Sequence, residues 1–402
     1  MITRLSNRVG KMQQSASIVV DQKVRELAAA GKDIIGLGSG EPDFDTPDNI
    51  KQAGVDAIWN GKTKYTAIDG IAELKAAIVE KFHRENGLSF RAQQISVAAG
   101  GKQIISNALA ATLDAGDEVV IAAPYWMTYP DVIKLWDGEP IIVECPQSSG
   151  FKLSPEQLET AITRKTKWVI LNSPSNPAGS AYTANELSAL VEVLRRHPHV
   201  NVMSDEIYEH IVFDDFKLVS ISQIAPALVG RTLIVNGVSK SYCMTGWRLG
   251  YAAGPEDIIR AMAKVQGQST SAPCSISQHA AVEALNGNQQ IITRLKKTYQ
   301  SRRDLVVAEL NKAPGIECAT PEGAFYVYPS CAGALGKLAP NGHAIVTEED
   351  FVLALLDCEG VAVVQGAAFG LSPHFRISIA ASDKKLAEAC ARILRFCTSL
   401  RK

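Results

Sequence analysis

The stretch Val235–Arg248, VNGVSKSYCMTGWR, decides how the rest of the chain is interpreted. It separates apolar runs at 232–235 and 249–253 and is rich in small and hydroxyl residues, so it is predicted to be a loop between two buried strands. Lys240 stands in the middle of this loop. A lysine in a partly desolvated loop loses proton affinity, and its neutral amine can attack a carbonyl to form a Schiff base. For one lysine alone, a solvated surface position is the simpler interpretation, so the hypothesis depends on the rest of the chain.

Helical and strand patterns alternate on both sides of this loop. Helices are expected at 47–60, 70–86, 102–113, 154–163, 183–196, 255–266 and 275–285, and strands at 95–98, 118–123, 140–144, 167–172, 200–204, 232–236 and 249–253. Such alternation predicts an α/β fold in which a mostly parallel, seven-stranded sheet lies between helices. Ligands bind beyond the carboxyl ends of the strands in such sheets, so functional residues are expected in the loops that follow strands.

The sequence is predicted to form two domains. Residues 47–290 are expected to form the large domain, and 291–402 a smaller α/β domain with a long helix (289–311) and strands at 361–364 and 374–380. Residues 1–46 are expected to form an N-terminal arm and part of the small domain.

Composition excludes several classes of protein. The 402 residues carry a net charge of −1, so no bulk attraction to nucleic acid or to anionic lipid is expected. No apolar run has the length of a membrane span or follows Met1 as a signal peptide would. The eight cysteines show neither a CxxC pair nor a zinc-ligand spacing, which favours a cytoplasmic protein without a disulfide framework. A nicotinamide oxidoreductase is not supported either, because GLGSG (36–40) is followed by Glu-Pro-Asp where a helix should open.

Two predicted strands end in features suited to an anionic or planar ligand. Gly100 and Gly101 follow the first strand directly and precede the helix that contains Lys102. Backbone N–H groups at such a helix start can close on an anion, although paired glycines alone more often make only a turn. Trp126 follows the next strand, where its ring either offers a stacking plane or packs in the core.

Two further strand ends carry polar side chains. Asn176 lies in a proline-stiffened loop and either donates to a ligand oxygen or caps the turn. Asp205 ends a buried strand, where a carboxylate is costly unless a cation meets it. Tyr208 is three residues further on and is expected on the same side of a helical turn.

In the small domain, Arg376 alternates with Phe375 and Ile377 and has Ser378 as its neighbour on the same face. An arginine within a strand suits a bidentate grip on a carboxylate, with a surface salt bridge as the alternative. Together with Arg248 as a second phosphate ligand, these groups suit a planar, phosphorylated, cationic ring. Pyridoxal phosphate is such a ring, and it needs a lysine and a carboxylate partner for its protonated nitrogen.

Nine ordered motifs also resemble one known family. They are SGEPDFDTP (39–47), GKTKYT (61–66), GGKQ (100–103), PYW (124–126), NSPSNPAG (172–179), SDEIYEH (204–210), SKSYCMTGWRLGYAAGP (239–255), GAFYVYP (323–329) and FRIS (375–378). In order and spacing they are similar to those of the class I aminotransferases of fold type I, a pyridoxal-phosphate-dependent family, and specifically its bacterial aspartate aminotransferase branch. The resemblance covers nearly the whole chain.

The resemblance implies a role for each residue at the cofactor. Lys240 would be the Schiff-base lysine and proton shuttle, and Asp205 would pair with the pyridinium nitrogen. Tyr208 and Asn176 would hydrogen-bond the ring hydroxyl oxygen, and Trp126 would stack on the ring. Arg248 and the backbone of Gly100, Gly101 and Lys102 would hold the phosphate, joined by Tyr65 from the partner subunit of a homodimer.

The resemblance also implies how substrates bind. Arg376, Asn176 and the Gly40 backbone would bind the substrate α-carboxylate, and Lys102 would read the side-chain carboxylate of acidic substrates. The implied reaction is ping-pong transamination between L-aspartate and 2-oxoglutarate, giving oxaloacetate and L-glutamate. Gln13 and Gln14 depart from the Lys-Pro of many relatives, where a basic residue is linked with acidic substrates such as prephenate.

Two alternatives stay open at this point. One is the same fold with prephenate, aromatic or broad amino-acid specificity, or with β-lyase activity, since a fold does not determine a function. The other is a cofactor-binding regulator without catalysis, but such proteins carry a DNA-binding module ahead of this fold. Here the fold begins within about forty residues of Met1, and the chain is not basic.

Overall fold

The central feature of the fold is a seven-stranded sheet. The protein is described here by a computed structural model, which describes residues 6–12 and 16–402. The strands run in the order β2-β8-β7-β6-β5-β3-β4, and their bounds are Ile95–Ala98 (β2), Glu118–Ala123 (β3), Glu139–Glu144 (β4), Thr166–Asn172 (β5), Asn201–Asp205 (β6), Thr232–Gly237 (β7) and Gly250–Ala253 (β8). Within this sheet β8 is antiparallel to both neighbours, and the remaining pairs are parallel. The predicted mostly parallel, seven-stranded sheet is confirmed.

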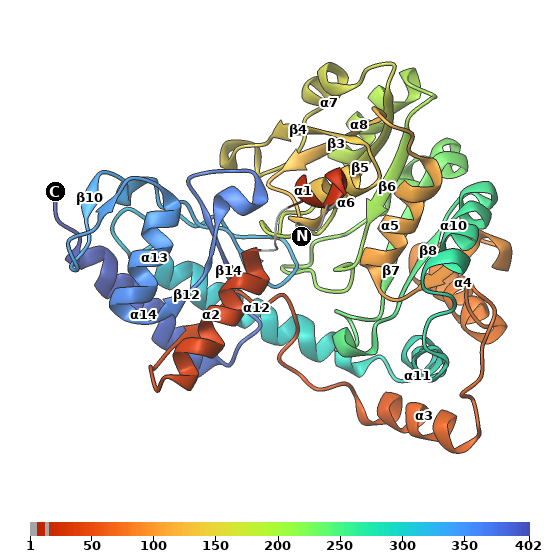
Figure 1. The fold of residues 1–402 in the computed structure, drawn as a ribbon, viewed down its shortest axis with the longest axis horizontal. Helices are drawn as coiled ribbons and strands as arrows, with labels where there is room; N and C mark the ends of the chain where they lie inside the picture. The colour runs from red at the N-terminus through yellow and green to blue at the C-terminus, as the bar shows by residue number, and fades with distance from the viewer. Residues whose placement is uncertain (1–5, 13–15) are drawn as a thin grey trace, which may run out of the picture.

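Helices cover both faces of the sheet (Figure 1). The helices of this part of the chain are α3 (Asp48–Trp59), α4 (Ala72–Asn86), α5 (Gly101–Thr112), α6 (Thr128–Leu135), α7 (Pro155–Ala161), α8 (Ala184–Arg196), α9 (Ile221–Ile224), α10 (Glu256–Ser269) and α11 (Ser275–Asn286). Among them α3 packs on α11 and lies away from the sheet (Figure 1). Along β3, Val119 and Ile121 pack into one hydrophobic cluster and Val120 into another. Since successive side chains of a strand point to opposite faces, a sheet buried on both sides needs such uniformly apolar strands.

The helix α6 was not among the predicted helices. It has eight residues, and Pro130 lies in its first turn, where a helix tolerates proline because the first N–H groups have no intrahelical acceptor. This helix matters for the site, because it presents Tyr129 to the end of the sheet.

The C-terminal part contains smaller sheets. It comprises α12 (Gln290–Leu310), β9 (Tyr326–Val327), β10 (Lys337–Leu338), β11 (Ala344–Ile345), α13 (Glu348–Glu359), β12 (Val361–Ala362), β13 (Val364–Gln365), β14 (Phe375–Ser378) and α14 (Asp383–Ser399). The strand predicted at 361–364 is two strands, because β12 pairs with β1 (Ile35–Gly36) while β13 pairs with β14. The N-terminal elements α1 (Asn7–Gly10) and α2 (Ala16–Ala29) precede β1.

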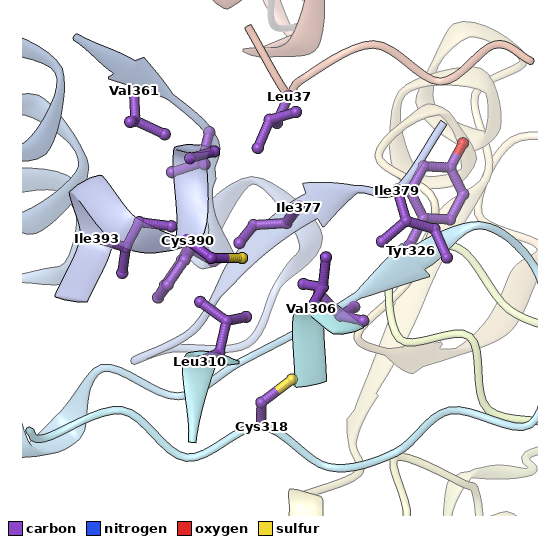
Figure 2. Close-up of a cluster of buried hydrophobic side chains, with 14 of the residues drawn as sticks. Leu37, Val306, Leu310, Cys318, Tyr326, Val361, Ile377, Ile379, Cys390 and Ile393 are labelled. Atoms are coloured by element: carbon purple, nitrogen blue, oxygen red, sulfur yellow. The ribbon is translucent and has the colours of Figure 1, made fainter. Parts of the chain in front are cut away.

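The core of this part is formed by segments far apart in the chain (Figure 2). Leu37 follows β1, Val306 and Leu310 come from α12, and Ile377 and Ile393 come from β14 and α14. The segment 35–37 therefore packs with residues after 290. The domain boundaries after residues 46 and 290 stay a prediction.

Two further points from the sequence concern the N-terminal residues and the absence of a membrane span. Gln13 and Gln14 lie outside the described residues. Among the helices that are described, none is both long enough and apolar enough to span a bilayer.

Candidate active site

One cavity of about 270 Å³ gathers most of the residues that the sequence singled out. It opens where the loops after β2, β3, β5, β6 and β7 meet, which is the edge at which such sheets bind ligands. Its lining includes Gly40, Gly101, Lys102, Trp126, Asn176, Asp205, Tyr208, Lys240, Arg248 and Arg376.

Lys240 is the amine of this cavity. Its Nζ donates a hydrogen bond to the carbonyl oxygen of Gly40 at 2.5 Å. Burial lowers the pKa of Lys240 to about 8; the charge of Glu41 opposes this shift, and the guanidinium groups of Arg248 and Arg376 add to it. A substantial fraction of neutral, nucleophilic amine is therefore present near pH 8.

Asp205 is the buried acid of the cavity. It is the last residue of β6 and is 4% exposed. Tyr129 Oη donates to its Oδ2 at 2.6 Å, and the Ile207 N–H donates to its Oδ1 at 3.3 Å. Burial raises the pKa of Asp205 to about 6, although these two hydrogen bonds and the charge of Lys240 oppose the rise. A cation that enters the cavity beside this buried carboxyl would stabilise its ionised form.

The opposite end of the cavity is suited to an anion. Gly100 precedes α5 with φ +96°, and a Cβ at this position would lie 2.5 Å from Nη2 of Arg248. The glycine thus admits the guanidinium to the N-terminus of a 12-residue helix, where the free N–H groups favour an anion. Arg248 is held there by hydrogen bonds to the carbonyl oxygens of Thr245 (2.8 Å) and Ala99 (3.3 Å).

Arg376 lies inside the protein. It is 2% exposed, so the surface salt bridge considered for it is wrong. Its Nη1 donates to Oδ1 of Asn176 at 2.9 Å and its Nη2 to the carbonyl oxygen of Gly38 at 2.5 Å. The guanidinium also lies 4.6 Å from the centre of the Tyr326 ring. This arginine is preorganised at the cavity wall, where a planar fork of donors suits a carboxylate.

The remaining lining residues supply aromatic and polar groups. The hydroxyl groups of Tyr208 and Tyr326 are 2.9 Å apart. Lys102 Nζ lies 5.2 Å from the centre of the Trp126 ring. Burial lowers the pKa of Lys102, and the charge of Arg248 adds to this effect while Asp131 opposes it.

Tyr65 is not part of this cavity. It is 97% exposed and follows α3, which also exposes Ile58 (51%) and Trp59 (85%). Within one chain, the structure therefore does not bring Tyr65 to the other candidate residues.

Sequence reasoning missed two tyrosines of the site. Tyr129 was missed because it belongs to the unpredicted helix α6, although it stands three residues after Trp126 and so at helical spacing from it. Tyr326 stands in the motif GAFYVYP but received no role, because its approach to Tyr208 joins segments 118 residues apart.

One family model and several proteins of known name are similar to this chain over nearly its whole length. A family model described as aminotransferase class I and II matches residues 32–393. The aspartate/prephenate aminotransferase of Cereibacter sphaeroides is 60% identical over 396 residues, which cover 98% of this chain and 99% of that protein. The aspartate aminotransferase of Rhizobium meliloti strain 1021 is 53% identical over 98% of this chain and 96% of that protein.

Solved structures of aspartate aminotransferases have the same fold as this chain. A crystal structure of the aspartate aminotransferase from Rhizobium meliloti has a TM-score of 0.97 and 52% identity, covering 99% of this chain and all of that one. The aspartate aminotransferase from Thermus thermophilus with maleate has a TM-score of 0.91 and 40% identity, covering 98% of this chain and all of that one.

Proposed function

This chain belongs to the class I and II aminotransferases, and we propose that it transfers the amino group of L-aspartate to 2-oxoglutarate with pyridoxal 5′-phosphate as cofactor. The observation that carries the proposal is a single cavity in which Lys240, the buried Asp205 and the anion site at Arg248 meet Arg376. The names of relatives at 50–60% identity support aspartate as the amino donor.

The residues present fit pyridoxal phosphate. Gly100 leaves space for Arg248 at the start of α5, which suits the phosphate, and Asp205 is a buried carboxyl that gains from a cationic ring nitrogen. Lys240 would hold the aldehyde end, and Trp126 would lie against the ring. Tyr208 and Asn176 would donate to the ring hydroxyl oxygen. When bound, the cofactor supplies an electron sink for the electrons released at the substrate α-carbon.

The chain's own groups would bind and orient the substrate. Arg376, with Asn176 and the backbone at Gly40, would hold the α-carboxylate, since the guanidinium is already fixed by two hydrogen bonds. Lys102, close to Trp126, would pair with the side-chain carboxylate of aspartate. Lys240, whose pKa of about 8 leaves it partly neutral, would take the proton from the α-carbon.

A homodimer is part of the proposal. Tyr65 cannot contribute to the cavity of its own chain in this arrangement, and it adjoins exposed apolar side chains on α3. Large exposed apolar patches mark association surfaces. A second copy docked there would place Tyr65 at the phosphate of the neighbouring site, and each site would then lie at the interface. Mass measurement by light scattering tests the dimer; a monomer with full activity would reject it.

The test of specificity is a panel of half-reactions followed through the cofactor absorbance. Aspartate and glutamate are expected to convert the enzyme faster than phenylalanine or cystathionine. A preference for phenylalanine would refute the assignment. Prephenate is the second candidate substrate, because two relatives at 58–60% identity carry it in their names. Its conversion by the aminated enzyme, measured beside 2-oxoglutarate, decides whether it is accepted.

A further inference from the structure

Behind Lys240 lies a chain of three side chains that the proposed function does not use: Glu85, His210 and Ser241. His210 Nε2 lies 2.8 Å from Oε2 of Glu85, and its Nδ1 lies 2.8 Å from Oγ of Ser241. Ser241 directly follows Lys240 in the loop after β7, and His210 follows Tyr208 by two residues in the loop after β6. The hydrogen bond between His210 and Ser241 therefore joins the two loops that carry the proposed catalytic groups.

The order of acid, imidazole and hydroxyl is that of a hydrolytic triad, but the surroundings do not suit a nucleophile. Ser241 is 1% exposed and does not line the cavity that contains Lys240. A buried hydroxyl that no substrate reaches cannot attack one. The three groups therefore have a supporting role.

A metal site is also not supported. Ligand atoms of Glu85, Glu209 and His210 lie within 4.8 Å of one another. However, the fully buried ammonium of Lys81 already pairs with Glu209 and lies 3.7 Å from Glu85. A divalent cation would have to enter beside an existing positive charge, which Coulomb repulsion opposes.

The ionisation of Glu85 determines the direction of its hydrogen bond with His210. Burial raises the pKa of Glu85, but the hydrogen bond from His210 and the charges of Lys81 and His210, with the hydrogen bond from Arg84, lower it to about 2. Glu85 is therefore ionised at neutral pH and can only accept, so Nε2 of His210 carries a proton. The other ring nitrogen, Nδ1, shares a hydrogen bond with the hydroxyl of Ser241.

The other groups that face the imidazole keep it in place. Glu209 Oε1 lies 3.8 Å from its Nε2, and the ring of Tyr242 meets it edge-on at 6.3 Å. Glu209 is itself held by Lys81 and by Nδ2 of Asn236 at 2.7 Å. Glu85 lies on α4, and α4 packs on β2 of the central sheet.

We propose that His210, held by Glu85, is a positioning residue that fixes Ser241 and thereby the Lys240 amine relative to Asp205 and Tyr208. This inference rests on the proposed function of Lys240 and deepens it. The physical reason is that a reactive group on a loop stays within reach of its target only if neighbouring packing and hydrogen bonds support it. Ser241 is the residue next to the reactive one, and its hydroxyl is tied to the rigid part of the large sheet.

The test uses Ser241→Ala, which removes one oxygen, and His210→Phe, which removes both hydrogen bonds. Tyr242→Phe is the matched control: this neighbouring buried side chain donates to Gln289 Oε1 at 2.8 Å and does not belong to the chain of three. All variants are compared by thermal unfolding, so that loss of the fold is recognised. If His210→Phe does not fold, Ser241→Ala decides.

The first measurement needs no cofactor. The cofactor-free protein is acylated with trace acetic anhydride at a series of pH values and digested with trypsin. The peptide Thr232–Arg248 survives intact only when Lys240 is acylated, because Lys240 is its sole internal cleavage site. In the wild type, labelling is expected to reach half its maximum near pH 8. In Ser241→Ala and His210→Phe the midpoint is expected to move upward, toward 10.5, because a released ammonium reaches solvent.

The second measurement is steady-state turnover of the holoenzyme with aspartate. In both test variants kcat is expected to fall about 10- to 100-fold, because a displacement of about 1 Å at a reacting group can cost that much. KM is expected to stay unchanged, since Arg376 and Asn176 are not touched. Tyr242→Phe is expected to behave as the wild type in both measurements.

Three results would overturn the inference: an unchanged labelling midpoint in both test variants, an unchanged kcat, or equal effects in Tyr242→Phe. Failure of the proposed function is a separate outcome. A wild-type protein that does not transaminate aspartate would reject the function, while the labelling midpoints would still decide whether His210 and Ser241 position Lys240.

Discussion

Replacing Tyr129 with phenylalanine tests whether this tyrosine keeps Asp205 ionised. The Tyr129 hydroxyl donates to the buried Asp205 carboxylate at 2.6 Å. A hydrogen bond to a charged group contributes about 1.5–3 kcal/mol. At about 1.36 kcal/mol for each pKa unit, its loss is expected to raise the pKa of Asp205 by about 1–2 units. In the cofactor-free protein the value would move from about 6 to roughly 7–8.

The consequence for cofactor binding depends on pH. If the bound cofactor requires ionised Asp205, the apparent affinity for the cofactor is proportional to the fraction of cofactor-free protein in which Asp205 is ionised. At pH 7 the variant is expected to bind the cofactor about two- to ten-fold more weakly than the wild type, and at pH 5 about ten- to one-hundred-fold more weakly. Above pH 8 the two proteins should converge, because Asp205 is then largely ionised in both.

The assay is a fluorescence titration of the cofactor-free proteins with pyridoxal phosphate between pH 5 and 9. Tyr182→Phe serves as the control, because it also removes a buried hydroxyl, one that accepts the Leu153 N–H at 2.8 Å away from Asp205. A loss of affinity in Tyr129→Phe that is the same at every pH would refute the reasoning, and so would an equal loss in Tyr182→Phe.

Three further predictions concern the same cavity. Lys240→Ala should abolish turnover but leave the fold and weak cofactor uptake, as circular dichroism and absorbance would show; retained multiple turnover would contradict its role. Lys102→Gln should lower kcat/KM roughly ten-fold for dicarboxylic substrates and less for monocarboxylic ones, because only the former lose a charged hydrogen-bond partner; equal losses would remove Lys102 from side-chain recognition. Burial raises the pKa of Asp205 from 3.8 to about 6, so between about pH 4 and 6 this residue binds more protons in the folded than in the unfolded protein. The cofactor-free protein should therefore lose up to about 3 kcal/mol of unfolding free energy as the pH rises from about 4 to above 6. Asp205→Asn should lack this part of the slope in urea unfolding at pH 4–7, and an unchanged slope would contradict the raised pKa.

Local sequence patterns were sufficient to predict the large sheet and the strand ends at which several cavity residues stand. Uniformly apolar strands such as Val119–Ile121 can only be buried on both faces, so they predict a parallel sheet between helices. Because the carboxyl ends of such strands share one edge, residues directly after them, such as Asp205 and Asn176, could be expected to meet there. Lys240 and Arg248 stand in one continuous motif, so their neighbourhood could also be predicted from a single stretch of sequence.

Contacts between distant segments could not be predicted in this way. Tyr129 reaches Asp205 across 76 positions and Tyr208 meets Tyr326 across 118, and neither pair leaves a periodic signal in the chain. The segment 361–364 is apolar throughout, and the sequence alone does not show that it is divided between two sheets. The division arises because Val361 and Ala362 pair with β1 while Val364 pairs with β14. The ionisation of Asp205 and Lys240 is likewise decided by folding, since burial and neighbouring charges, rather than residue type, move their pKa values. Sequence thus determined which chemical groups are available, and tertiary packing determined how near they lie to one another and how much water surrounds them.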